Sequence, residues 1–217
     1  MQIGILGGTG PAGSALAARL ASVGYQVVLG SRSKYRAMEV RDGLWERWPD
    51  HELGIDAGDN IAAADTDVIV VATPWDSAAT TCLSVADQLD GKVVITMANA
   101  LARIGKEFVP LIPPRGSVAA SVQATVRGAR VAAAFQHVPA KELGDLTAPV
   151  ESDVLICSDH QSAIAATTEI VDKVPGFRAL DSGELSNATA IEAFTAVMLQ
   201  LNVRYRTRVG LKLTGIK

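Results

Sequence analysis

The sequence has little of what builds disulfide frameworks, metal centres or surfaces for polyanions. Its two cysteines, Cys82 and Cys157, lie far apart and form no Cys-x-x-Cys pair, which excludes the usual disulfide and zinc patterns. The three histidines, His51, His137 and His160, are equally scattered, so we predict no metal site. With a formal net charge of −3, the chain has no excess of positive charge for binding nucleic acid.

Long hydrophobic runs and targeting signals are also missing. No stretch approaches the length and purity of a membrane-spanning helix, and the N-terminus lacks the basic region and cleavage site of a signal peptide. Of the 217 residues, 48% are nevertheless hydrophobic, which is enough for a sizeable core. We therefore expect a cytoplasmic protein that binds small molecules, with neither a membrane nor a nucleic acid as partner.

The chain does have a glycine-rich turn at its start. The apolar start of the stretch 1–13 predicts a short strand, and residues 14–23, rich in alanine and leucine, predict a helix. Between them, Gly8, Gly10 and Gly13 occupy the positions of a G-x-G-x-x-G dinucleotide loop. Glycine serves there for a tight turn, for close approach of a pyrophosphate and for helix packing, while the first N–H groups of the helix face the phosphates. This pattern predicts a nucleotide site.

The residues after the second predicted strand (25–30) indicate which dinucleotide is bound. Sites that prefer NAD usually carry an acidic residue about 20 residues past the glycine loop. Here Ser31 and Arg32 stand at that place, followed by Lys34 and Arg36. A hydroxyl and cations bind a 2′-phosphate through charge-assisted hydrogen bonds, whereas a carboxylate would repel it. A solvated basic loop is the alternative, but the spacing from the glycine loop favours NADP(H).

Apolar runs predict buried strands at residues 67–74 and 93–98 and a further strand at residues 130–135. Ligands of such sheets gather at the carboxyl ends of the strands, which places Thr73, Pro74 and Trp75 near the cofactor. His137 is the one histidine that follows such a strand end. The segment with Pro110, Pro113 and Pro114 predicts a loop.

The alternation of strands and helices predicts an α/β fold. We expect a Rossmann-type, doubly wound parallel sheet that binds NADP in residues 1–140. Residues 141–217 are expected to form a small C-terminal α/β domain ending in a long helix that runs to about Tyr205. This helix carries two apolar stripes, which predicts burial against a second subunit, with the sheet edge of the same chain as the alternative.

The catalytic patterns of common dehydrogenases are missing. Tyr35 and Tyr205 are followed four residues later by Glu39 and Val209, so neither begins a Tyr-x-x-x-Lys pair. This favours a hydride transfer between two redox cofactors, in which orientation and electrostatics suffice. An NADP-dependent reductase of a small carbonyl, imine or flavin is an alternative. A non-catalytic NADP(H)-binding redox sensor is another.

Several segments along the chain share one family pattern: residues 6–10, 30–32, 72–75, 138–140 and 180–187, and the similarity extends through residues 210–215. Together they resemble the NADPH-dependent reductases of coenzyme F420, also called F420-dependent NADP oxidoreductases. The resemblance implies a Rossmann domain with a small C-terminal domain, a homodimer, and transfer of a hydride between the nicotinamide of NADP and the deazaflavin ring of coenzyme F420. It implies neither a metal nor a covalent intermediate.

The same resemblance implies a set of site residues. Gln136 stands where the family often has histidine, and it and His137 are the candidate ring contacts. The deazaflavin pocket would be bordered by His137, Val138, Pro139, Ala140, Gly210, Leu211 and Lys212. NADP would be held by Gly8, Thr9, Gly10, Pro11, Ala12, Gly13, Ser31, Arg32, Arg36, Thr73, Pro74, Ser77, Met97 and Ala98.

Overall fold

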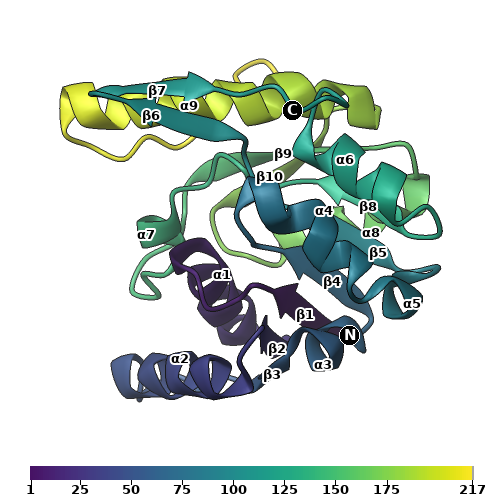
Figure 1. Cartoon of the computed structure of the whole chain (residues 1–217). Helices are drawn as coiled ribbons and strands as arrows, with labels where there is room; N and C mark the ends of the chain where they lie inside the picture. The colour runs from purple at the N-terminus through teal and green to yellow at the C-terminus, as the bar shows by residue number, and fades with distance from the viewer. Residues whose placement is uncertain (217) are drawn as a thin grey trace.

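Eight strands form one sheet in the computed structural model, which describes residues 1–216 (Figure 1). In spatial order the strands are β10 (Phe177–Asp181), β9 (Ser152–Ser158), β8 (Arg130–Ala133), β5 (Val93–Thr96), β4 (Val68–Val71), β1 (Gln2–Leu6), β2 (Gln26–Ser31) and β3 (Ile55–Asp59). Neighbouring strands are parallel, except that β9 is antiparallel to β8. The predicted α/β class with a mostly parallel sheet is confirmed.

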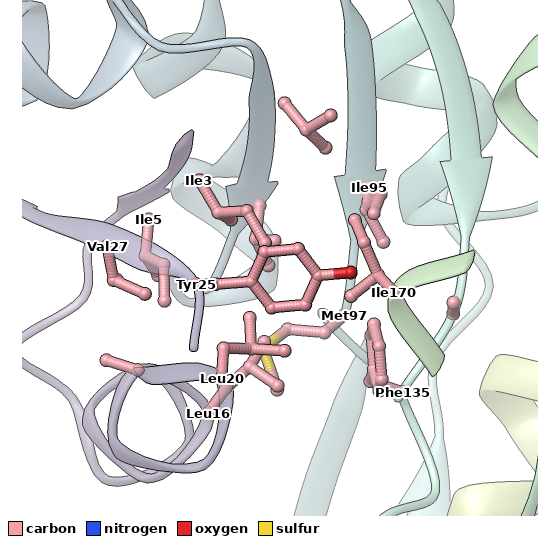
Figure 2. Close-up of a cluster of buried hydrophobic side chains, with 14 of the residues drawn as sticks. Ile3, Ile5, Leu16, Leu20, Tyr25, Val27, Ile95, Met97, Phe135 and Ile170 are labelled. Atoms are coloured by element: carbon pink, nitrogen blue, oxygen red, sulfur yellow. The ribbon is translucent and has the colours of Figure 1, made fainter. Parts of the chain in front are cut away.

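Helices cover both faces of this sheet, which is why its central strands are apolar without alternation. One face packs against α1 (Pro11–Ser22), α2 (Lys34–Arg47) and α8 (Gln161–Asp172). Figure 2 shows part of this core, where Ile3 and Ile5 of β1 lie against Leu16 and Leu20 of α1. The other face packs against α3 (Asn60–Ala64), α4 (Trp75–Leu83), α5 (Ala86–Leu89) and α6 (Val118–Thr125).

The C-terminal part of the chain extends the same sheet. In the antiparallel pair, Cys157 of β9 lies opposite Ala133 of β8, so the first residues of β9 reach beyond the carboxyl end of β8. The connection between these strands contains α7 (Ala140–Leu143). The predicted division at residue 140 stays a prediction, since the sheet is continuous across it.

The predicted long helix is present as α9 (Ala188–Tyr205), preceded by the short 3-10 helix η1 (Leu185–Asn187). The chain then returns along β9, where the N–H of Asp153 donates to the carbonyl oxygen of Leu211 at 2.7 Å. The predicted proline loop is present at Pro113 and Pro114, but Pro110 instead ends a hairpin of β6 (Leu101–Ile104) and β7 (Glu107–Pro110). Pro110 can occupy this position because it is the last residue of its strand, where no backbone N–H is needed to donate a hydrogen bond to the neighbouring strand.

Gly4 tests how tightly β1 packs against α3. A Cβ at this position would lie 1.7 Å from the carbonyl oxygen of Ala63, so Gly4→Ala forces backbone apart. We expect it to lower the free energy of unfolding by about 3 kcal/mol, at the upper end for overpacking. Gly43→Ala in α2 is the matched control, because nothing lies within 4 Å of its added methyl group. It should raise stability by about 0.5–1 kcal/mol. Urea unfolding measures both, and equal effects would contradict the packing argument.

Candidate functional site

A cleft of about 620 Å³ opens at the carboxyl ends of β1, β2 and β4. Its walls are the glycine turn before α1, the residues after β2, the start of α3 and one face of α4. Seven of the predicted nucleotide residues line it: Thr9, Gly10, Ser31, Arg32, Thr73, Pro74 and Ser77. Six further lining residues were not predicted: Gly7, Asn60, Ala72, Thr80, Thr81 and Ser84.

The glycines of the turn divide into packing positions and an open position. The N–H of Gly8 donates to the carbonyl oxygen of Gly30 at 2.9 Å, which joins the turn to β2. A Cβ on Gly13 would lie 2.9 Å from the Cα of Gly8, so both positions need glycine for packing. A Cβ on Gly10 would have only the carbonyl oxygen of Gly7 within 4 Å, at 3.8 Å. The backbone at Gly10 is therefore open to a ligand in the cleft.

The start of α1 provides unpaired donors at the same place. Gly10 is its N-cap without a side-chain hydrogen bond, and Pro11 is its first residue. The N–H groups at the start of a helix have no intrahelical partners, and with the helix dipole they favour an anion. Pro11, Ala12 and Gly13 are outside the cleft lining, but the backbone of Ala12 and Gly13 supplies these donors.

Gly7 is a fourth glycine that the motif did not include. Its φ of 68° lies in the left-handed region, and a Cβ there would lie 2.5 Å from Cγ2 of Thr73. Its N–H donates to Oδ1 of Asn60 at 3.4 Å. The signal for Gly7 was the glycine pair that it forms with Gly8; nothing in the sequence pointed to Asn60.

The predicted basic cluster is divided in the structure. Arg32 lines the cleft beside Ser31, whose hydroxyl accepts from the N–H of Ser33 at 3.3 Å. Arg36 lies one turn along α2 outside the cleft lining, and its Nη1 donates to Oε2 of Glu39 at 2.9 Å. Arg32 is therefore the cation that borders the cleft directly.

One face of α4 adds a row of hydroxyl groups. Thr80 and Thr81 follow Ser77 by three and four residues, and the C-cap Ser84 follows them by four and three, which places all four on one side of the helix. Ser77 and Thr80 donate to carbonyl oxygens within the helix turn, each at 3.1 Å, and keep lone pairs free for a ligand. The spacing of these small polar residues was visible in the sequence, but of the four only Ser77 was predicted to bind the nucleotide.

Met97 and Ala98 occupy the two cores rather than the cleft. Met97 belongs to the core beneath α1, near Leu16 and Leu20 (Figure 2), and Ala98 to the core on the opposite face. Both side chains are 7% exposed, and neither lines the cleft.

Gln136 and His137 are buried beyond the carboxyl end of β8. Nε2 of His137 lies 2.7 Å from the carbonyl oxygen of Asp153, while its Nδ1 has no partner among the described residues. Burial lowers the pKa of His137, against the opposing effect of the Asp153 carbonyl, so the ring is neutral at pH 7. Nε2 therefore donates and Nδ1 is an acceptor without a donor. The carboxamide of Gln136 likewise has no partner for either polar atom.

The backbone carbonyl of Gln136 is held by two other elements. Nδ2 of Asn99 donates to it at 2.8 Å, and the hydroxyl of Thr195 on α9 lies 3.4 Å from it. The next residues continue toward α7: Val138 is buried, Pro139 is the N-cap and Ala140 is the first helical residue. Ala140 also lines a smaller cavity between α1, α2 and α7.

Asp153 brings the C-terminal segment 210–212 to this region. Its carboxylate is fully buried and forms a bidentate pair with Arg178, at 2.9 and 2.7 Å. The hydrogen bonds from Arg178 lower the pKa of Asp153. The same residue bonds His137 through its carbonyl and Leu211 through its N–H. Lys212 pairs with Glu151 at 3.4 Å. Predicted deazaflavin residues from two distant segments thus meet at the backbone of Asp153.

Within residues 1–216 no group of three or more His, Cys, Asp or Glu side chains could hold a metal ion. Both cysteines are free and buried, and burial raises the pKa of each thiol to about 12. His51 and His160 lie away from the cleft lining. No helix in the described part of the chain is long and apolar enough to span a membrane.

Glu192 of α9 is a buried carboxylate that sequence reasoning missed. Its two oxygens accept from the N–H groups of Val118 and Ala119, at 2.8 and 3.1 Å, and so hold α9 on the first turn of α6. Burial raises its pKa from 4.5 to about 7, although the two hydrogen bonds oppose the shift.

The Glu192 shift predicts a pH dependence of stability. Because the folded state holds this proton more tightly than the unfolded chain, the stabilisation is complete below pH 4.5 and is lost as the pH rises through about 7. We expect the free energy of unfolding of the wild type, minus that of Glu192→Gln, to fall by about 2–3 kcal/mol over this range. Denaturant titrations at several pH values measure the difference. Parallel pH profiles for the two proteins would contradict the assignment.

Comparison with known proteins gives consistent similarities along the chain. A family model described as NADP oxidoreductase, coenzyme F420-dependent, matches residues 2–100. The chain is 34% identical over 225 residues to the F420-dependent NADP reductase of Methanocaldococcus jannaschii, with all of both sequences covered. It is 35% identical over 222 residues to the protein of that name from Methanothermobacter thermautotrophicus, covering 100% of this chain and 96% of the relative.

A solved structure supports the fold independently. The crystal structure of a candidate F420-dependent NADP reductase from an Arthrobacter species superposes with a TM-score of 0.84. The two chains are 22% identical, and 99% of each is covered. At this identity the likeness concerns the fold alone.

Proposed function

The chain belongs to the family of F420-dependent NADP reductases, and on that premise we propose that it transfers a hydride directly between NADP(H) and the deazaflavin coenzyme F420. The observation that carries the proposal is the identity of 34–35% to curated reductases of that name over the whole chain. The protein is accordingly an oxidoreductase with NADP(H) and coenzyme F420 as its two substrates.

The cleft supports the NADP(H) side of this proposal. Its open backbone at Gly10 and the N–H groups at the start of α1 fit a pyrophosphate. Arg32 and Ser31 border the cleft where an NAD site would carry a carboxylate, and a guanidinium suits a 2′-phosphate. Arg36 contributes positive potential from α2, reduced by its pairing with Glu39. Thr73, Pro74 and the hydroxyl row of α4 bind the rest of the nucleotide.

The deazaflavin side rests on the polar atoms beyond β8. Nδ1 of His137 and the carboxamide of Gln136 are buried without partners, and a buried polar group without a hydrogen bond is costly. A ring with carbonyl and N–H groups could supply such partners only after these side chains move, because their polar atoms are closed off from solvent. The segments 137–140 and 210–212 border this region at the same edge of the sheet as the cleft.

The protein acts mainly by orientation. A hydride would pass from the nicotinamide of NADPH to the deazaflavin ring, which also takes up one proton from solvent, and both would be given back in the reverse direction, without metal or covalent intermediate. For this step the chain would have to hold the two reacting carbons within about 3–3.5 Å of each other. Because the proton comes from solvent, no side chain has to donate it, which agrees with a neutral, buried His137.

The exposed apolar residues of α9 support a homodimer. Phe194, Val197 and Val203 are exposed in the single chain, and so is Ile104 of the hairpin that packs beside α9. An apolar surface of this kind suits a second copy of the chain.

We also propose that the protein is cytoplasmic, in keeping with small-molecule substrates and buried, free cysteines.

An absorbance assay tests the second substrate. Purified protein should oxidise NADPH when coenzyme F420 is added, because the proposed site binds the nicotinamide and the deazaflavin ring together. It should leave a simple imine and free flavin unreduced. Reduction of an imine or flavin in place of coenzyme F420 would contradict the proposal. NADPH binding without turnover of any acceptor would instead support a redox sensor.

Arg32→Ala tests the choice of NADP over NAD. Loss of one charge-assisted hydrogen bond, worth about 1.5–3 kcal/mol, should weaken NADPH binding roughly tenfold to a hundredfold. The affinity for NADH, which lacks the 2′-phosphate, should stay unchanged and serves as the internal control. Fluorescence titration measures both dissociation constants. An unchanged NADPH affinity, or an equal loss for both nucleotides, would refute the role of Arg32.

A further inference from the structure

A second cavity, of about 340 Å³, lies between α1, α2 and α7, and no residue lines both it and the nucleotide cleft. Figure 1 shows α7 and α2 on opposite sides of α1. Ala15, Leu44 and Ala140 give this α1–α7 cavity apolar walls, and Ser14, Arg47 and Lys141 bring polar groups to it. It is a built cavity of mixed character, and the NADP(H) site does not account for it.

The cavity carries two cations that no carboxylate neutralises directly. Neither Arg47 nor Lys141 forms a salt bridge within residues 1–216. The nearby Glu142 is paired with Arg208 at 3.0 Å. Asp145 accepts hydrogen bonds from Thr147, although Arg47 is close enough to help lower its pKa. The guanidinium of Arg47 lies 5.2 Å from the ring centre of Trp48, which leaves its N–H groups free for an anion.

Hydrogen bonds hold the cavity in its shape. The buried guanidinium of Arg19 on α1 donates to carbonyl oxygens of Leu143, Glu142 and Ala148, at 3.0, 3.1 and 3.1 Å, and also to that of Asp145. A Cβ on Gly144 would lie 3.1 Å from the Cβ of Ala15, so the end of α7 lies against α1. The cavity therefore exists before any ligand binds.

The chain leads from the deazaflavin region directly into this cavity. His137 and Gln136 lie beyond β8, and three residues after His137 the chain lines the α1–α7 cavity at Ala140. Coenzyme F420 carries, beyond its ring, a side chain with a phosphodiester and carboxylates. A ring bordered by residues 137–140 would adjoin this positively charged cavity at Ala140.

We propose that the α1–α7 cavity binds the anionic side chain of the deazaflavin substrate through Arg47 and Lys141. This inference rests on the proposed function, because it presumes that coenzyme F420 is the second substrate. The cavity then distinguishes the complete coenzyme from the bare ring. It contributes to substrate affinity and has no part in the hydride step.

The experiment compares two acceptors in steady-state assays with NADPH. One is coenzyme F420, and the other is its deazaflavin riboside, which has the same ring without phosphate or carboxylates. In the variant with Arg47→Gln and Lys141→Gln, KM for coenzyme F420 should rise about tenfold, as expected for two solvent-accessible charge contacts. KM for the riboside, KM for NADPH and both kcat values should not change. If Arg47 is replaced by Lys instead of Gln in the double variant, the rise in KM for coenzyme F420 should be smaller.

Arg41→Gln is the matched control on the same helix, since Arg41 pairs with Asp42 and lies over the ring of Trp45. It should leave all these constants unchanged. An unchanged KM for coenzyme F420 in the double variant overturns the inference, and so does an equal rise for the riboside or a rise for NADPH. If the wild type reduces neither deazaflavin, the proposed function fails and this inference with it.

Discussion

The close packing of the glycine turn among β1, β2 and β4 is the constraint on which the site depends. Gly8 is bonded to β2, and Gly13 touches Gly8 too closely for any side chain. This contact brings the first turn of α1 to the strand ends, where its N–H groups face the cleft. Because the strands are parallel, their carboxyl ends meet at one edge, and Ser31 of β2, the residues that follow β4 and the hydroxyl groups of α4 line the same cavity.

A buried carboxylate organises the other half of the proposed site. β9 runs antiparallel to β8, so its first residues lie beyond the carboxyl end of β8. Asp153 there is stabilised by Arg178, and its backbone bonds both His137 and Leu211. Asp153 thereby holds residues 136–139, which follow β8, next to the C-terminal segment 210–212. α7 continues from residues 136–139 onto α1, where Arg19 donates to the carbonyl oxygen of Leu143, so α1 contacts both the glycine turn and the deazaflavin region.

Much of the fold could be predicted because its signals are local. Apolar runs marked β1, β4 and β5, and the glycine spacing marked the turn into α1. The hairpin of β6 and β7 was missed because its stability comes from α9, where Gln200 accepts from the N–H of Phe108. The proline-rich composition of that segment gave the opposite signal. Met97 was placed at the site by its strand end, yet its side chain points into the core beneath α1.

The sequence alone determined the α/β class, the dinucleotide turn and the cation at Arg32, because turn geometry and charge are properties of a few adjacent residues. Tertiary structure decided which neighbours those residues meet. It separated Arg36 from the cleft, added the hydroxyl row of α4 and brought segments 137–140 and 210–212 to Asp153. It also brought Arg47 and Lys141 to one cavity. Contacts over such separations depend on strand order and helix packing, which no local pattern encodes.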